Sequence, residues 1–226
     1  MKGKLLVVAA HPDDQVLGCG GTVARLVRAG WEARCLILGE GATSRDERRD
    51  RAGRSREISG LKSQTAEANR ILGFRKSFSL DFPDNRFDTV PLIEIVKAVE
   101  KVKAEFEPQM VFTHHPGDLN IDHKAAFEAV ITATRPVAGE PVREIYSFEV
   151  MSSTEWAYPG TFHPDVFYDI TATMKRKLDA MRRYKTELKE PPHPRSLDGI
   201  RACASAWGFK NGMGYAEAFQ TVRVLR

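Results

Sequence analysis

The amino-acid sequence predicts a Rossmann-like three-layer α/β sandwich with a mostly parallel sheet. Short apolar runs alternate with longer segments of helical periodicity through the first half of the chain, which is the order of a parallel sheet with helical crossovers. Clusters of histidine and aspartate follow two of these runs, at the strand ends where open α/β sheets bind ligands. No internal repeat or low-complexity linker interrupts this order, so we expect one continuous domain.

The first predicted strand, Leu5–Ala10, is a continuous apolar run, as expected for a strand buried on both faces. Apolar side chains recur at helical spacing over residues 16–29, and Gly30 ends that helix. The same patterns predict the other elements of this half: strands at 33–38, 77–80 and 110–113, and helices at 61–72 and 92–106.

The pattern changes from Glu144 onward. We predict strands at 145–150 and 166–169, an amphipathic helix at 171–188, and a final helix at about 215–222. The predicted organisation is a single domain over 1–226, with a Rossmann-like core at 1–143 and C-terminal elements on the substrate side at 144–226.

Length and composition are those of an ordinary globular domain, with 226 residues of which 42% are hydrophobic and 28% charged. No apolar run approaches the roughly 18 residues that suggest a membrane span, and the N-terminus leads straight into the first strand. These features predict a cytoplasmic protein without a membrane partner. The three cysteines are widely spaced and form neither a zinc-finger pattern nor a disulfide framework.

The formal net charge is +4, and much of it comes from the arginine-rich stretch between Arg45 and Arg56. This stretch is either a solvated surface or a basic loop that attracts an anionic substrate, such as a nucleotide sugar. No groove pattern of aromatic and basic residues accompanies the charge, so we do not expect a nucleic-acid partner.

The first polar cluster, His11-Pro12-Asp13-Asp14, directly follows the first strand. Imidazole nitrogen and carboxylate oxygen both suit Zn²⁺, and helix capping would explain only one of the two aspartates. A dinucleotide site is the alternative, because three glycines follow at positions 18, 20 and 21. The required spacing fails at position 23, which is valine, and a pyrophosphate would face two carboxylates. The cluster therefore predicts a metal site.

The second polar cluster runs from His114 to His123, between the fourth strand and a helical pattern. Two such clusters at the ends of parallel strands can converge on one point, and we predict His123 as the third metal ligand. Asp122 beside it is placed to orient a ligand or a catalytic imidazole. For Asp118 and Asn120, which are good turn formers, a structural role stays equally open.

The pattern Ala10-His11-Pro12-Asp13-Asp14, followed by Asp118-x-Asn120-x-Asp122-His123, resembles the LmbE-like/PIG-L family of zinc-dependent N-deacetylases, over nearly the whole chain. The resemblance implies that His11, Asp14 and His123 bind Zn²⁺, or another divalent ion such as Fe²⁺. It also implies that Asp13 is the general base and that the enzyme hydrolyses the N-acetyl group of an amino sugar or its glycoside. Three protein ligands leave room for a water whose pKa the metal lowers to about 7, and Asp13 can take its proton.

The chain departs from the family pattern at three positions. Gln15 stands where the family usually has glutamate, and we give it no catalytic role. Asn120 stands where several members have an assisting histidine; we keep Asn120 and Asp122 with Asp13 in the predicted catalytic set, although Asn120 cannot act as an acid. His114, His115 or His193 could supply the missing imidazole. Lys62 stands where members tend to have arginine, and we predict that it binds substrate.

Three further residues are predicted to bind substrate. Asp84 and Arg86 lie in the loop after the third strand, where related enzymes use an aspartate to bind sugar hydroxyls. Arg195, in a proline-rich loop, is a candidate for an anionic substrate group. The predicted function is N-deacetylation of a small N-acetylated amino sugar. A deacetylase or amidase of a sugar-thiol or antibiotic intermediate is the alternative, followed by a non-catalytic metal-stabilised binding protein. The sequence is compatible with a homo-oligomer and does not decide the oligomeric state.

Overall fold

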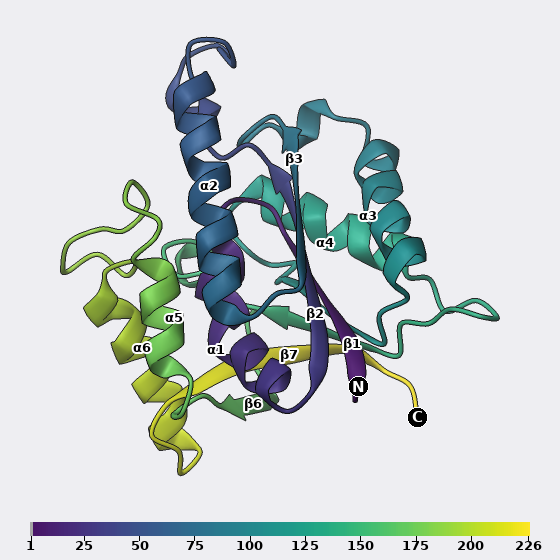
Figure 1. Cartoon of the computed structure of the whole chain (residues 1–226), viewed down its shortest axis with the longest axis vertical. Helices are drawn as coiled ribbons and strands as arrows, with labels where there is room; N and C mark the ends of the chain where they lie inside the picture. Colours follow the sequence, from purple (N-terminus) through teal and green to yellow (C-terminus); the bar gives the residue numbers. More distant parts are fainter. Residues whose placement is uncertain (1) are drawn as a thin grey trace.

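The computed structural model describes residues 2–226, and these residues form a single seven-stranded sheet (Figure 1). Its first five strands in spatial order are parallel, and β7 runs antiparallel to both of its neighbours. The mostly parallel α/β sheet predicted from the sequence is confirmed. Across the sheet the order is β3 (Lys76–Phe82), β2 (Trp31–Gly39), β1 (Gly3–Ala9), β4 (Met110–His114), β5 (Glu144–Phe148), β7 (Ala216–Val224) and β6 (Val166–Asp169).

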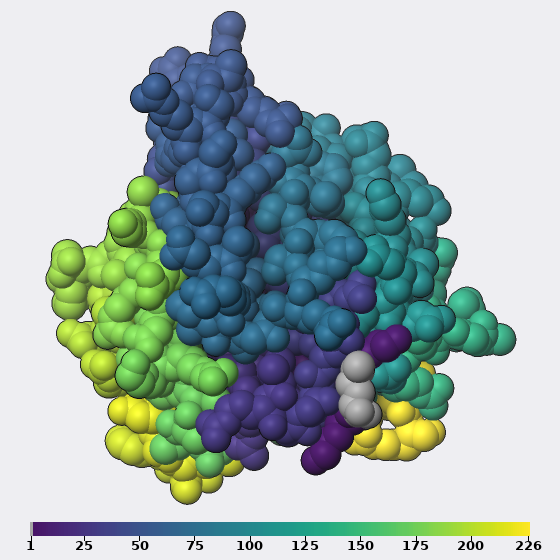
Figure 2. All heavy atoms as spheres, viewed as in Figure 1, coloured from purple at the N-terminus to yellow at the C-terminus, as the bar shows by residue number. Residues whose placement is uncertain are grey.

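Helices cover both faces of the sheet, which gives the three predicted layers (Figure 1). One face carries α1 (Asp14–Arg28), α2 (Ser55–Leu72), α5 (Met174–Met181) and α6 (Leu197–Lys210), and the other carries α3 (Leu92–Phe106) and α4 (Ile121–Ala133). Short 3₁₀ turns lie at Thr43–Arg45, Phe87–Thr89 and Thr154–Trp156. The segment between β2 and α2, blue at the top of the space-filling view, projects from the body (Figure 2).

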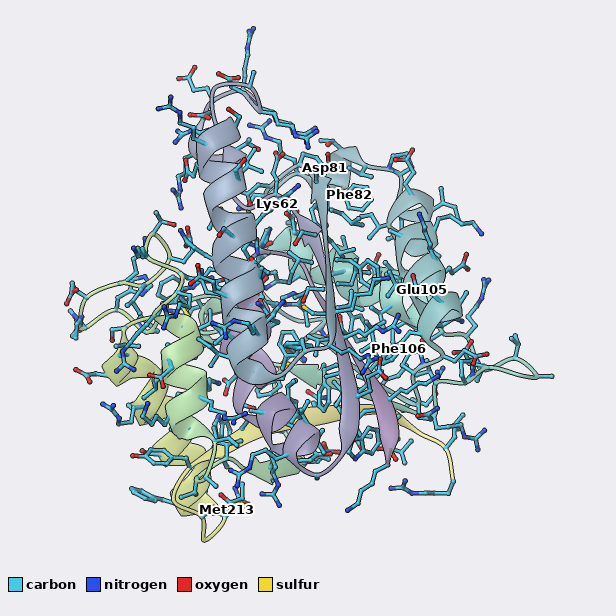
Figure 3. The ribbon with its side chains drawn as sticks, viewed as in Figure 1. Lys62, Asp81, Phe82, Glu105, Phe106 and Met213 are labelled. Atoms are coloured by element: carbon cyan, nitrogen blue, oxygen red, sulfur yellow. The ribbon has the colours of Figure 1, made fainter. Side chains whose placement is uncertain are left out.

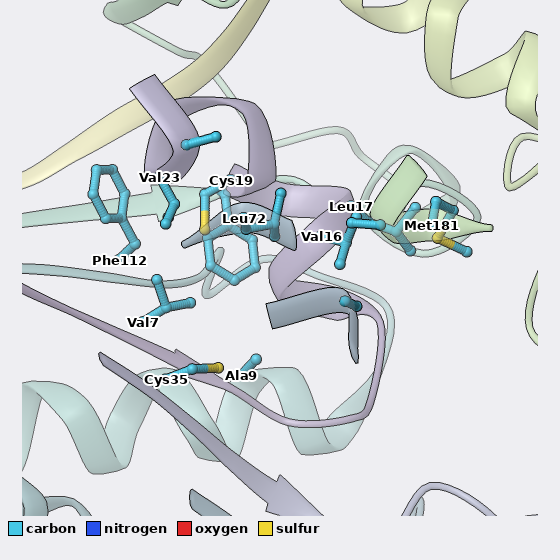
Figure 4. Close-up of a cluster of buried hydrophobic side chains, with 14 of the residues drawn as sticks. Val7, Ala9, Val16, Leu17, Cys19, Val23, Cys35, Leu72, Phe112 and Met181 are labelled. Carbon is cyan, nitrogen blue, oxygen red and sulfur yellow. The ribbon is translucent and has the colours of Figure 1, made fainter. Parts of the chain in front are cut away.

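The strand β1 divides two hydrophobic cores. Alternate side chains point to opposite faces of a strand, so Val7 and Ala9 join the core under α1 while Leu6 and Val8 join the core under α3 and α4. Figure 4 shows the first of these cores, in which Cys19 of α1 is fully buried. Burial raises the pKa of its thiol well above the usual value, so Cys19 packs as a small apolar residue.

The predicted final helix at 215–222 is wrong, because this segment is the strand β7. It pairs with β5 on one side and β6 on the other, and this tertiary pairing outweighs local propensity. Glu217 is buried in it and accepts hydrogen bonds from the backbone of Thr22 (2.7 Å) and from Lys177 Nζ (2.6 Å). The strand is thereby tied to α1 and α5.

Two other differences lie in the C-terminal third. The helix predicted at 171–188 is shorter, since α5 ends at Met181 and turns follow it. The helix α6 was not predicted at all, although its start carries a recognisable signal. Ser196 caps it by accepting a hydrogen bond from the backbone of Gly199 at 3.0 Å, and Asp198 lies in its first turn.

The order of the strands fixes where a ligand can bind. The chain winds outward from β1 to β2 and β3, and later returns to place β4 on the other side of β1. The carboxyl ends of β1 and β4 therefore flank the point where the winding reverses, which is the usual binding crevice of open α/β sheets. Within residues 2–226, no helix is long and apolar enough to cross a membrane.

Candidate metal centre and active site

The turn between β1 and α1 holds Asp13 in an unusual backbone conformation. Its φ of 97° lies in the left-handed region, which costs free energy for a residue other than glycine. The Asp13 backbone N–H donates to Gln15 Oε1 at 3.2 Å, and Gln15 Nε2 in turn donates to Asn69 Oδ1 (2.9 Å) and Tyr184 Oη (2.7 Å). This buried network keeps the strained turn in place, which gives Gln15 a structural task.

Three predicted ligands converge beside this turn. One donor atom each of His11, Asp14 and His123 lies within 4.8 Å of the other two. Asp14 Oδ2 is 3.4 Å from His11 Nδ1 and 3.4 Å from His123 Nε2. Asp14 Oδ1 and His123 Nε2 are buried and have no hydrogen-bond partner within the part of the chain that the structure describes. Unpaired buried polar atoms are costly, so this donor set fits a divalent ion.

A carboxylate lies on the far side of each imidazole. His11 Nε2 lies 2.9 Å from Asp122 Oδ2, and Asp122 also accepts hydrogen bonds from the backbone of Asn85 (2.6 Å) and Phe87 (2.9 Å). His123 Nδ1 lies 3.1 Å from Asp118 Oδ1. These contacts leave His11 Nδ1 and His123 Nε2 to face Asp14, as in metal sites where carboxylates orient the ligands.

The contact to Asp118 was not predicted for His123. Asp118 is fully buried and accepts hydrogen bonds from the hydroxyls of Ser153 and Thr154, which follow β5. A turn-forming aspartate and a ligand-orienting one look the same in sequence, because the partners come from a distant loop. The five-residue spacing to His123 is the only local signal, and it does not distinguish the two roles.

Burial and neighbouring charges shift the pKa values of the two adjacent aspartates in opposite directions. Burial alone would raise the pKa of Asp14, but the charges of His123 and His114 hold it well below its usual range. Burial raises the pKa of Asp13 to about 7, although the nearby charge of Arg195 opposes the rise. Asp14 is therefore suited to stay ionised as a ligand, and Asp13 to exchange a proton near neutral pH.

A polar cavity of about 190 Å³ opens in front of the three predicted ligands. Four of the predicted residues besides His11 line it, namely Asp13, Asp84, Asn120 and Arg195. Asp14, Asp122 and His123 are buried behind this surface. Ser44, Asn85 and Glu187, which were not predicted, also line it, as does Arg45 of the arginine-rich stretch. Arg45 and Glu187 are paired at 2.8 Å across 142 positions of sequence, and no local pattern relates them.

Two residues predicted to bind substrate do not line this cavity. Lys62 is exposed on α2 (Figure 3). Arg86 donates from Nη2 to the backbone oxygens of Asp46 (3.4 Å) and Glu47 (3.2 Å), which supports the arginine-rich loop. Substrate binding by Lys62 and Arg86 stays a prediction.

Asn120 caps the helix that carries His123. Its Oδ1 accepts from the backbone N–H of Asp122 at 2.8 Å, and its Nδ2 donates to Asn85 Oδ1 at 2.8 Å. The side chain thus reaches the cavity with its acceptor and one donor already engaged.

The three histidines that could replace an assisting imidazole are also engaged. His114 is fully buried behind the ligands, where its Nε2 accepts from the backbone N–H of Ala10 at 2.8 Å. His115 Nε2 lies 2.9 Å from Thr161 Oγ1. His193 Nδ1 accepts from the backbone N–H of Arg195 at 3.1 Å. None of the three lines the cavity.

The arginine-rich loop is largely paired with carboxylates. Arg49 and Arg51 lie 3.0 and 3.7 Å from Glu40, and Arg54 lies 2.6 Å from Asp46. Arg45 pairs with Glu57 and Glu187 and also reaches the cavity. Most of the positive charge in this stretch is therefore neutralised by its own surroundings.

Deacetylases are among the known proteins that this chain resembles. Diacetylchitobiose deacetylase of Thermococcus kodakarensis is 27% identical over 229 residues, which cover 97% of this chain and 83% of that protein. An uncharacterised deacetylase of Escherichia coli K12, YaiS, is 29% identical over 188 residues, or 80% and 90% of the two chains.

The fold is also that of a solved structure. The conserved protein TT1542 of Thermus thermophilus superposes with a TM-score of 0.77 at 28% identity, and the match covers 99% of this chain and 97% of that one. The family model of GlcNAc-PI de-N-acetylase (PIG-L) matches residues 6–134, which include both polar clusters. This chain therefore belongs to the PIG-L (LmbE-like) family, whose members include deacetylases.

Proposed function

We propose that this protein is a metal-dependent hydrolase that removes the N-acetyl group from an amino sugar or an amino-sugar conjugate. The observation that carries the proposal is the buried set of His11, Asp14 and His123, with unpaired donor atoms, directly behind Asp13 on the wall of a polar cavity. The name of the chitobiose deacetylase relative supports an amino-sugar substrate.

Zinc is the ion we propose, with Fe²⁺ as the alternative. Two imidazoles and one carboxylate are a usual ligand set of catalytic zinc, and such sites keep a fourth position open. When bound there, the ion supplies an acidified water and polarises the carbonyl of the substrate amide. Asp118 and Asp122 hold the two imidazoles with one nitrogen each toward Asp14.

Asp13 is the residue proposed to move the proton. It takes a proton from the water as the water oxygen adds to the amide carbon, and negative charge develops on the acyl oxygen. Asp13 then gives this proton to the nitrogen as the carbon–nitrogen bond breaks, so that acetate and the amine leave. Burial raises the pKa of the Asp13 carboxyl group, which favours a group that first accepts a proton and then returns it.

The remaining predicted catalytic residues act by positioning. Asp122 orients His11, and Asn120 caps the helix that presents His123. On the cavity wall, Asp84 is proposed to accept hydrogen bonds from sugar hydroxyls. It already accepts one from the backbone of Ser44 at 3.1 Å, and its carboxylate faces the cavity.

The test is release of acetate from free, nucleotide-linked and thiol-linked N-acetyl amino sugars and from N-acetylated, glycosylated antibiotic intermediates, measured together with the zinc content of the protein. We expect about one ion per chain and turnover of at least one sugar class. Turnover of thiol-linked sugars or glycosylated antibiotic intermediates alone would select the alternative substrates. Bound zinc without acetate release from any of them would indicate a metal-stabilised binding protein. The cytoplasmic location and a homo-oligomer stay predictions.

A further inference from the structure

Two arginines line the cavity, and they differ in how many carboxylates neutralise them, two for Arg45 and one for Arg195. Arg45 is occupied at both ends of its guanidinium, by Glu57 at Nη1 and by Glu187 at Nη2. Arg195 uses Nε and Nη1 only, and its Nη2 has no acceptor among residues 2–226. Arg195 therefore brings unused, positively charged donors to the cavity.

The guanidinium of Arg195 is held in place from behind. Its Nε donates to Ser152 Oγ at 2.8 Å and lies 3.2 Å from the backbone oxygen of Met151. Ser152 is itself fixed in the left-handed region, with φ of 66°, and its N–H donates to Glu155 Oε1 at 2.6 Å. A planar donor group fixed in this way loses little entropy when it binds an oxygen atom.

One terminal nitrogen of the guanidinium faces Asp13, and the other has no acceptor within the described part of the chain. Arg195 Nη1 lies 3.3 Å from Asp13 Oδ2, across 182 positions of sequence. A water that gives its proton to Asp13 attacks a carbonyl carbon a few ångströms away, so the oxygen of that carbonyl lies within reach of a donor beside Asp13. Negative charge develops on this oxygen during attack, and a fixed cationic donor stabilises it.

Other side chains around the cavity are less suited to this task. Asn120 has its Oδ1 and one N–H engaged, and His114 accepts a backbone hydrogen bond deep behind the metal ligands. We propose that Arg195 is a catalytic residue, which donates a hydrogen bond to the acyl oxygen as the amide is attacked and then to the carboxylate of the acetate product. The inference rests on the proposed deacetylase function. It assigns Arg195 to the reacting acyl group, whereas the sequence predicted contact with an anionic group of the substrate.

The kinetic test compares Arg195→Met with Arg195→Lys and with Arg201→Met, an exposed arginine on α6 that pairs with Asp198. Loss of one such donor costs about 10²–10³ in kcat. We expect this loss for Arg195→Met with KM within threefold, a smaller loss for Arg195→Lys, which keeps the charge, and no change for Arg201→Met. A kcat within threefold of wild type, or a loss confined to KM, would overturn the proposal.

Ser152→Ala provides a second variant that leaves Arg195 in the chain. Because it removes the hydrogen bond at Nε, it should lower kcat about tenfold, in line with the loss of one positioning contact. Zinc content and the thermal unfolding midpoint are measured for every variant. If Arg195→Met does not fold, the Arg195→Lys and Ser152→Ala variants decide the question by the same kcat criterion.

Acetate binding to the metal-free protein gives a readout that does not involve turnover. Broadening of the acetate methyl NMR signal should reveal binding to the wild-type protein and at least tenfold weaker binding to Arg195→Met. Equal binding by the two proteins would overturn the role of Arg195. Failure of the wild-type enzyme to release acetate from any N-acetyl sugar would instead refute the proposed function, so the two failures are distinguishable.

Discussion

The cavity has two walls that the chain builds in different ways. The metal wall is formed by His11, with Asp14 and His123 buried behind it. These residues follow β1 and β4, which the parallel sheet places side by side. The C-terminal wall, formed by Glu187 and Arg195, lies on loops after α5 and before α6. The difference between the walls teaches that, under the proposed function, the sheet positions the groups for the reaction, while loops supply the groups proposed to bind the substrate.

The largest effect is expected from removing a ligand of the metal wall. His123→Ala deletes a buried donor atom, so zinc content should fall from about one ion per chain to near zero and acetate release to background. His163→Ala, at an exposed histidine outside the cavity, is the matched control and should keep both. Unchanged zinc content in His123→Ala would remove this residue from the site.

Asp13→Asn tests the proposed proton transfer while keeping the backbone conformation of the turn. Asparagine tolerates the left-handed backbone of this position and has the same shape, but it cannot accept the proton of the water. We expect kcat to fall by about 10²–10⁴ with zinc content unchanged. Turnover near that of wild type would rule out Asp13 as the base.

Asp118→Asn sharpens the comparison, because Asp118 connects the metal wall to the loop after β5. It faces His123 on one side and the hydroxyls of Ser153 and Thr154 on the other. Loss of a carboxylate that orients a metal ligand typically weakens metal binding about 10–100-fold. Zinc affinity measured by competition with a chelator should fall by this amount; an unchanged affinity would make Asp118 a residue of the turn alone.

The pH dependence of stability in the metal-free protein tests the buried state of Asp13. Because its pKa rises from 3.8 to about 7 on folding, the folded state binds more protons than the unfolded state between these values. Stability therefore falls as pH rises through this window, by up to about 1.4 kcal/mol per pH unit. Asp13→Asn removes this contribution, so its unfolding free energy relative to wild type should increase from pH 4 to pH 7. A constant difference would contradict the burial of Asp13.

The smallest effects are expected for the residues predicted to bind substrate, and Lys62 should have the smallest of all. Asp84→Ala, on the cavity wall, should raise KM about tenfold, since a buried polar contact to substrate is worth about 1–2 kcal/mol. Lys62→Ala, on the exposed side of α2, should change KM less than threefold. A large rise in KM for Lys62→Ala would place substrate beyond the cavity and restore the residue to the binding site.

The parts of the site that could be predicted share one property, which is that their signals are local. His11 and Asp14 lie three residues apart on one turn, and His123 opens a helix directly after a strand. Arg195 could be named only as a loop cation, because its contact to Asp13 depends on how α5 and α6 pack. The roles of Asp118 and Glu187 likewise depend on partners that only the folded chain brings near.

In the fold, too, the elements with local sequence signals could be predicted and those that depend on distant partners could not. The alternation of apolar runs and helical periodicity predicts the parallel half of the sheet, whose central strands β1 and β4 are buried on both faces. The segment Ala216–Val224 carries residues compatible with helix or strand, and its pairing with β5 and β6 decides the outcome. The helix α6 was missed although Ser196 is a standard cap, because a proline-rich loop precedes it.

The central claim is that His11, Asp14 and His123 hold a metal that this protein needs to remove an N-acetyl group. The most direct measurement is acetate release from N-acetyl amino sugars by the zinc-loaded protein, by the same protein stripped with a chelator, and after zinc is added back. We predict turnover in the first and third samples and background release in the second. Equal turnover by the stripped and loaded proteins would contradict the claim.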